Sequence, residues 1–208
     1  MTDLENLHFT CSSCTTCKLA ATRKNVVFGE GHPDAQLMII GEGPGEDEDK
    51  TGRPFVGRAG QLLDQILAAV QIPRESVYIA NMVKCRPPGN RNPEMDEIAA
   101  CEHWLLEQIQ LIRPQIIITL GNVPTQWAMG TTLGITKTRG VWGEFKKLST
   151  PIKIFPMFHP AYLLRNPIRT TGGPKWLTWQ DIKAVKAELE LLGAKPNIKL
   201  EVEQTTLF

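Results

Sequence analysis

The sequence predicts an α/β fold of three layers, with helices covering both faces of a mostly parallel central sheet. Short apolar segments rich in β-branched residues are typical of buried strands, and segments with helical spacing of apolar residues lie between them. The expected strands are Leu37–Gly41, Val77–Val83, Gln115–Gly121 and Lys153–Phe158. Because strands that alternate with helices form parallel sheets covered on both faces, we expect one such sheet.

The first expected helix is Gly57–Val70, where the apolar residues fall on one helical face. The second is Pro93–Ile112, with Asn92 as its N-cap and a proline at its first position. Asn122–Met129 is expected to form a short third helix. A long helix, Lys175–Leu192, follows and is closed by a glycine.

The chain has 208 residues, enough for one hydrophobic core. We expect one domain over residues 1–193 and a C-terminal tail over residues 194–208. No apolar run reaches the ~18 residues needed to span a bilayer, and the first ten residues carry acids without an apolar signal core. These features predict a cytoplasmic protein without a membrane partner, and we expect a monomer.

The net charge of +1 does not by itself indicate a nucleic-acid-binding protein. The distribution of charge is more informative, because seven basic residues between Lys137 and Arg169 face one acid, Glu144. Such a stretch is suited to neutralising phosphates, although an ordinary solvated face has the same composition. The basic residues are Lys137, Arg139, Lys146, Lys147, Lys153, Arg165 and Arg169.

Five cysteines, an odd number in a chain without an apolar signal core, argue against a disulfide framework. Cys14 and Cys17 form a C-x-x-C pair, whereas Cys85 follows the second strand and Cys101 lies in the second helix. Four thiolates suit either Zn²⁺ or a [4Fe–4S] cluster, and their spacing does not choose between them. A redox C-x-x-C leaves the second pair unexplained. Cys11 is a spare, and buried structural cysteines are the remaining alternative.

A glycine-rich loop, Gly41-Glu42-Gly43-Pro44-Gly45, follows the first strand. It matches neither the dinucleotide pattern, since Glu46 replaces the third glycine, nor the P-loop. The acidic run 46–49 repels phosphate, and it suits either a Mg²⁺ site or a solvated loop. Glycines here admit a flat ligand to the backbone, with Phe55 available for stacking.

Chemically capable residues stand at the carboxyl ends of three expected strands. They are the glycine-rich loop 41–45, Asn81 and His159. Ligands of open parallel sheets bind at this edge, so we expect these residues to meet in one crevice.

Several long motifs in this chain resemble the type-4, iron–sulfur uracil-DNA glycosylases. The glycine-rich loop followed by Thr51-Gly52-Arg53-Pro54-Phe55-Val56-Gly57-Arg58-Ala59-Gly60 resembles the first motif of that family. His159-Pro160-Ala161-Tyr162-Leu163-Leu164-Arg165 is similar to the second motif of the superfamily. The segment 78–85 and four cysteines also match, so the resemblance covers roughly residues 11 to 190.

The resemblance implies excision of uracil from DNA as a step of base excision repair. It also implies a [4Fe–4S] cluster with a structural role, held by Cys14, Cys17, Cys85 and Cys101, with Cys11 not a ligand. A related group traps the sugar through a histidine on a basic loop. That histidine is absent from residues 85–93, which favours an enzyme with turnover.

Expected roles for the pocket residues follow from this resemblance. Phe55 stacks on uracil, and Asn81 reads the base edge through N3–H and O4. His159 donates a hydrogen bond to O2 as charge grows there, assisted by the backbone N–H near Gly43. Glu42 is the first candidate for positioning the attacking water, and Glu48 is the second. Type-1 enzymes have an aspartate in the corresponding motif, so the choice of carboxylate stays open.

Uracil-containing DNA, single- or double-stranded, is the expected partner. Leu163 or Leu164 is expected to wedge into the base stack, and Arg165 to hold a phosphate. The last residues, Gln204–Phe208, resemble the peptide by which repair proteins bind a sliding clamp. Two other interpretations are a non-catalytic nucleic-acid-binding module with a structural cluster and an iron–sulfur oxidoreductase.

Overall fold

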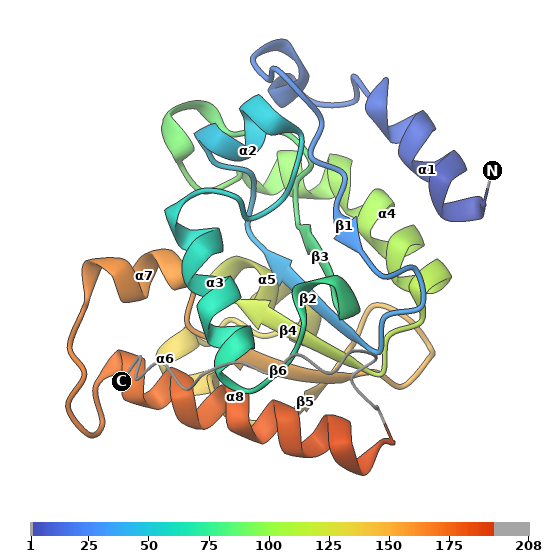
Figure 1. The fold of residues 1–208 in the computed structure, drawn as a ribbon. Coiled ribbons are helices and arrows are strands. Elements are labelled where there is room, and N and C mark those ends of the chain that lie inside the picture. Colours follow the sequence, from blue (N-terminus) through green and yellow to red (C-terminus); the bar gives the residue numbers. More distant parts are fainter. Residues whose placement is uncertain (1, 194–208) are drawn as a thin grey trace.

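A six-stranded sheet stands between two layers of helices in the computed structural model, which describes residues 2–193 (Figure 1). The three-layer α/β/α architecture expected from the sequence is therefore confirmed. The four central strands run parallel in the order β3, β2, β4, β6, and each coincides with or lies inside an expected strand. They are β2 (Leu37–Gly41), β3 (Tyr78–Asn81), β4 (Ile116–Leu120) and β6 (Lys153–Met157).

Two antiparallel strands at the edges of the sheet, β1 (Glu30–Gly31) and β5 (Gly143–Glu144), were not predicted. Strands of two residues are too short to carry a hydrophobic period. The N-terminal helix α1 (Asp3–Ser12) and the shorter helical elements were also not predicted. These shorter elements are the 3₁₀ turns Lys18–Ala21, Arg74–Ser76 and Pro88–Asn90, and the helices α2 (Glu46–Thr51), α6 (Ile135–Thr138) and α7 (Pro160–Arg165).

Alternation of side chains along the central strands produces two separate cores. Met38 and Ile40 of β2 belong to the core that is covered by α1 (Asp3–Ser12), α4 (Met95–Ile112) and α5 (Asn122–Met129). Leu37 and Ile39 belong to the opposite core, which is covered by α3 (Arg58–Ala69), α7 and α8 (Pro174–Leu191). Both faces of the sheet are therefore buried, which explains why apolar residues follow one another along each strand without polar alternation.

The start of α4 differs from the prediction. Its N-cap is Glu94 rather than Asn92, and its first residue is Met95 rather than Pro93. Glu97 explains the shift, because its buried carboxylate accepts from the backbone N–H of Glu94 at 2.7 Å in a capping box.

The C-terminal ends of the two long helices were close to those expected. Arg113, with φ of 54°, follows α4 and precedes Pro114, and Gly193 follows α8 with φ of 74°. Within residues 2–193, no helix combines the length and apolar character needed to cross a membrane. The expected tail, residues 194–208, lies outside the described residues.

Candidate active site and cysteine site

A pocket opens at the carboxyl ends of β2, β3, β4 and β6. From β2 the chain passes to β3 on one side and then crosses to β4 on the other, so the pocket lies at the switch point of the sheet. Loop residues after each strand line it, so the convergence expected from the sequence is observed. From the predicted set, the lining includes Glu42, Gly43, Glu48, Phe55, Asn81, His159 and Arg165.

Asn81 supplies an unsatisfied acceptor to this pocket. The side chain is 2% exposed, and its Oδ1 has no hydrogen-bond partner in the described part of the chain. Buried polar atoms are nearly always paired, so an orphan acceptor in a pocket indicates a ligand that donates. Gly41 faces Asn81 in the β2–β3 register, and a Cβ there would lie 2.4 Å from Oδ1. Only glycine at position 41 leaves room for this amide beside β2.

Phe55 forms a flat apolar wall beside Asn81. A Cβ on Gly41 would lie 2.6 Å from Cζ of Phe55, so the same glycine also makes room for the ring. The backbone of Phe55 has φ of 51°, in the left-handed region that non-glycine residues avoid. Gly60 permits this conformation, because a Cβ there would lie 1.9 Å from the carbonyl oxygen of Phe55. Strain of this kind is typical of functional sites.

His159 is the N-cap of α7, and its ring lies 5.8 Å from that of Phe55, centroid to centroid. Its Nδ1 accepts from the backbone N–H of Ala161 at 3.1 Å, which places the ring proton on Nε2. Burial, assisted by the charge of Arg165, lowers the pKa of His159 to about 4. The imidazole is therefore neutral near pH 7 and offers Nε2–H as a donor.

Glu42 lies at the N-terminus of α5, where its carboxylate accepts from the backbone N–H of Val123. Gly121 lets it approach, since a Cβ there would lie 2.8 Å from Oε1 of Glu42 and 3.5 Å from Cβ of His159. Burial raises the pKa of Glu42, and the Val123 N–H and the Arg165 charge partly oppose that rise. A half-buried carboxylate with a raised pKa is suited to accepting a proton from water.

Glu48 lines the pocket, but backbone groups already occupy both of its carboxylate oxygens. Oε2 accepts from the N–H of Gly45 at 3.0 Å, and Oε1 accepts from Val56 and Gly57, both at 2.9 Å. These bonds connect the start of α2 to the loop that carries Phe55. Glu48 thus has an evident role in shaping the pocket wall, whereas Glu42 keeps more of its acceptor capacity.

Two further acids of the run have partners within the chain. Asp49 is buried and accepts from the backbone N–H of Lys24 at 2.8 Å, and Glu46 pairs with Lys50 at 2.6 Å. Within residues 2–193, no three His, Cys, Asp or Glu side chains form a group able to hold a metal ion. The run thus does not form the Mg²⁺ site considered from the sequence.

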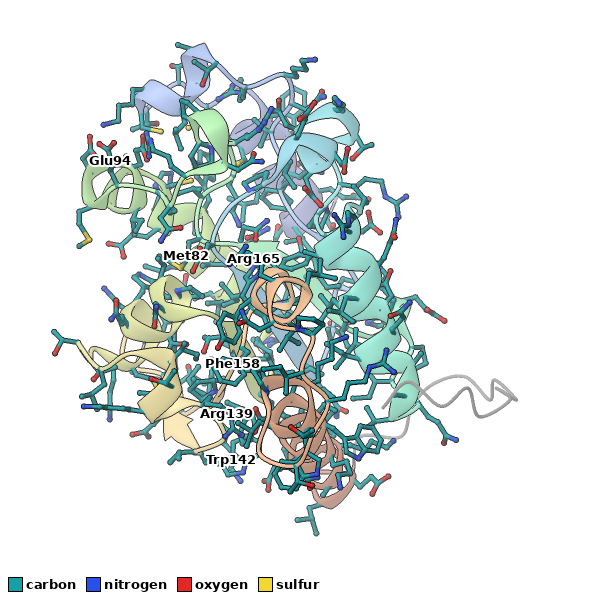
Figure 2. All side chains as sticks on the ribbon, turned by 90° about the vertical axis from the view of Figure 1, so that its left-hand side faces the viewer. Met82, Glu94, Arg139, Trp142, Phe158 and Arg165 are labelled. Atoms are coloured by element: carbon teal, nitrogen blue, oxygen red, sulfur yellow. The ribbon has the colours of Figure 1, made fainter. Side chains whose placement is uncertain are left out.

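The leucines of α7 have different surroundings. Leu163 is 1% exposed and packs in the core beneath α7, so of the two leucines expected to reach DNA it is the one without an exposed surface in this structure. Leu164 is half-buried and Arg165 is exposed. Figure 2 shows Arg165 on α7 above Phe158 and Arg139 on this face of the molecule. Burial of one of two adjacent leucines is a property of helix orientation, which the motif does not reveal.

Only part of the basic stretch 137–169 is available to a ligand. Four of its cations form ion pairs, namely Arg139 with Asp181, Lys146 with Glu144, Lys147 with Glu102 and Lys153 with Glu188. In the part of the chain that the structure describes, Lys137, Arg165 and Arg169 form no ion pair. Arg165 is the one of these three that lines the pocket.

The loop after Cys85 lines the pocket too, which the sequence analysis did not predict. Its contributions are Pro87, Asn90, Arg91, Asn92 and Pro93. Arg91 is fixed by two hydrogen bonds to the buried carboxylate of Glu97, at 2.8 Å and 2.6 Å. This loop follows the carboxyl end of β3, and that position in the sequence could have predicted its place in the pocket lining.

The five cysteines line one small cavity between α1, the 3₁₀ turn 18–21 and α4. Arg23 donates to Sγ of Cys85 at 3.3 Å, and the backbone N–H of Lys84 donates to Sγ of Cys101 at 3.3 Å. All five are free thiols, and burial raises the pKa of Cys11 to about 12. Thiols that share one cavity are suited to holding either a metal ion or an iron–sulfur cluster.

An orphan amide acceptor, an aromatic wall and a neutral imidazole at strand ends define a protein that binds a flat polar ring. A family model described as the uracil DNA glycosylase superfamily matches residues 28–183. The chain belongs to this superfamily.

Several curated relatives are type-4 uracil-DNA glycosylases. The protein from Thermotoga maritima is 51% identical over 184 residues, covering 86% of this chain and 91% of the relative. The protein from Sulfurisphaera tokodaii is 48% identical, covering 80% of this chain and 78% of the relative. The protein from Saccharolobus solfataricus is 46% identical, with 88% and 83% covered. The resemblance to type-4 enzymes stated from the motifs is confirmed.

The neutral state of His159 can be measured directly. We expect histidine NMR to give His159 a pKa of about 4, because burial disfavours the imidazolium. Since the unfolded chain binds this proton near 6.5, His159 lowers folding stability as pH falls through that interval. Arg165→Gln is the control, and we expect it to raise the pKa by removing a nearby cation. Titration of His159 near 6.5 in the folded protein contradicts the assignment.

Proposed function

We propose that this protein is a monofunctional uracil-DNA glycosylase, which hydrolyses the bond between uracil and deoxyribose and leaves an abasic site in DNA. The observation that carries the proposal is the buried, unpartnered Oδ1 of Asn81 in the pocket. The family assignment supports it independently. The glycosylase domain spans residues 1–193, and uracil-containing DNA is the substrate.

Asn81 reads the edge of the base. Its Oδ1 accepts from N3–H of uracil, and its amide donates to O4. Cytosine presents the reverse pattern at these two positions, which leaves buried groups unpaired at about 1–3 kcal/mol each. Phe55 stacks on the ring, and the strained backbone of Phe55 holds that wall in place before the base arrives.

Bond cleavage leaves negative charge on uracil and positive charge on the sugar. Nε2–H of His159 donates to O2, where a preorganised donor lowers the barrier without transferring a proton. The backbone N–H near Gly43 adds a second donor. Glu42 orients the attacking water and stabilises the cation-like sugar. Glu48 is the alternative carboxylate, but its three backbone donors favour a role in positioning.

The base reaches this pocket only when it leaves the helical stack, which costs a few kcal/mol. Leu164, half-buried on α7 and next in the chain to the pocket-lining Arg165, takes the place of the departed base, since Leu163 is confined to the core. Arg165 is exposed at the pocket mouth and binds a backbone phosphate. Single strands, which avoid the cost of unpairing, are substrates as well.

The cysteine cavity holds a [4Fe–4S] cluster bound by Cys14, Cys17, Cys85 and Cys101. When bound, the cluster supplies a covalent link between the N-terminal segment and α4 rather than a step of the reaction. Support comes from the five free cysteines around one cavity and from the donors that face two of the sulfurs. Cys11 lies in the last turn of α1, fully buried, and stays a neutral thiol.

The C-terminal residues Gln204–Phe208, which lie outside the described residues, bind a sliding clamp in this proposal. Leu207 and Phe208 supply an apolar pair suited to a groove on the partner. Deletion of these five residues is expected to abolish retention by immobilised clamp while excision of uracil stays unchanged. If the full and shortened chains are retained equally, the proposed interaction with a clamp is refuted.

Asn81→Ala tests the pocket assignment. We expect it to abolish uracil release, because the acceptor for N3–H is lost, without lowering the melting temperature. The measurement is single-turnover excision on a uracil oligonucleotide, followed by cleavage of abasic sites with alkali. Thr119→Val, which removes a buried hydroxyl outside the pocket, is a matched control. Normal excision by Asn81→Ala refutes the assignment.

Glu42→Gln and Glu48→Gln distinguish the two carboxylates. Glu42→Gln is expected to lower kcat by about 10²–10⁴-fold with an unchanged melting temperature, because the base for water is lost. Glu48→Gln is expected to lower stability by about 1–3 kcal/mol, since an amide cannot accept from all three backbone donors.

The pH profile provides the matching check. The pKa of Glu42 is raised, and the reaction requires its ionised form. As pH falls, the kcat of the wild type is therefore expected to decrease with a midpoint above the usual pKa range of glutamate. This decrease should be absent in Glu42→Gln. A catalytic loss in folded Glu48→Gln that exceeds the loss in Glu42→Gln reverses the roles.

A further inference from the structure

Lys84 has a buried ammonium group that the proposed reaction does not use. The residue is 1% exposed, although charge is among the most costly features to bury. Its Nζ donates to the carbonyl oxygen of Asn81 at 3.0 Å and to Oε1 of Gln108 at 2.6 Å. Within residues 2–193, no carboxylate forms an ion pair with this ammonium. A buried cation that meets only neutral acceptors lacks a counter-charge.

The same residue borders the cysteine cavity. Lys84 lines the cavity, its backbone N–H donates to Sγ of Cys101 at 3.3 Å, and Cys85 follows it in the chain. A cluster held by four thiolates is anionic, so it supplies the missing counter-charge.

Gln108 fixes the position of this ammonium. It lies on α4 and is fully buried, and its Nε2 donates to the carbonyl oxygen of Phe28 at 2.9 Å and to the hydroxyl of Tyr78 at 3.1 Å. Its Oε1 is therefore directed at Lys84 and cannot rotate away without leaving buried donors unpaired. The charge is held between the cavity and the end of β3.

We propose that Lys84 is a positioning residue that couples the two sites: its ammonium balances the charge of the cysteine-bound cluster and anchors the strand end that presents Asn81 to the base. This rests on the functions proposed above for the pocket and the cavity. Loss of the ammonium therefore alters both the electron affinity of the cluster and the reading of uracil.

Lys84→Met in the full, cluster-loaded protein tests the proposal. We expect kcat for uracil excision to fall roughly 10- to 100-fold, because Asn81 loses its anchor, with KM for the DNA unchanged. The reduction potential of the cluster, measured by voltammetry, is expected to become more negative because a neighbouring cation favours the added electron. Iron and sulfide content per chain confirms loading.

Thr119→Val serves as the control, because it breaks the buried Thr119–Thr125 hydroxyl pair without contacting either site. The proposal is overturned if either kcat or the potential of Lys84→Met equals that of the control.

If Lys84→Met gives no folded, iron-loaded protein, Gln108→Glu replaces it. This variant gives Lys84 a competing counter-charge, but it also removes the Nε2 donors to Phe28 and Tyr78, so the reduction potential is its readout. We then expect a more negative potential, and an unchanged potential overturns the proposal. Wild-type protein that releases no uracil refutes the proposed function instead, while the potentials still decide the charge pairing.

Discussion

The register between β2 and β3 is the constraint on which the pocket depends. It places Gly41 opposite Asn81, so a buried amide stands against a residue without a side chain. A slip of one residue turns every side chain of a strand to the other face, which would move the amide into a core. Phe55 can pack over the same glycine because Gly60, which has no Cβ, leaves room for the carbonyl group of Phe55. The aromatic wall is therefore a consequence of two glycines and one strand register.

Burial at these strand ends then sets the chemical state of the ionisable groups. It lowers the pKa of His159 and raises that of Glu42, so each is shifted toward its neutral form. For the imidazole this is useful, because a neutral donor needs no protonation equilibrium near pH 7. For Glu42 the backbone N–H of Val123 and the charge of Arg165 limit the shift. Arg165 thus favours the neutral histidine and the ionised glutamate together.

Most of the fold and the central residues of the site could be predicted from the sequence. Apolar runs marked β2 with the same bounds as the structure, and the strand ends identified Asn81 and His159 as neighbours. The features that could not be predicted depend on contacts between residues that are distant in the chain. The burial of Leu163 depends on how α7 sits against the core. The α4 cap depends on Glu97 being fixed by Arg91, which lies in a loop without any periodic pattern.

The acidic run 46–49 shows why composition alone misleads. Four consecutive acids suggested a metal site or a solvated loop, and they ruled out a phosphate cradle. Asp49 instead accepts from the backbone N–H of Lys24, and Glu48 accepts from Val56 and Gly57. Carboxylates can satisfy several backbone donors at once, so they connect loops that have no regular structure of their own. The loop bearing Phe55 is strained, and these acids supply hydrogen bonds that hold it.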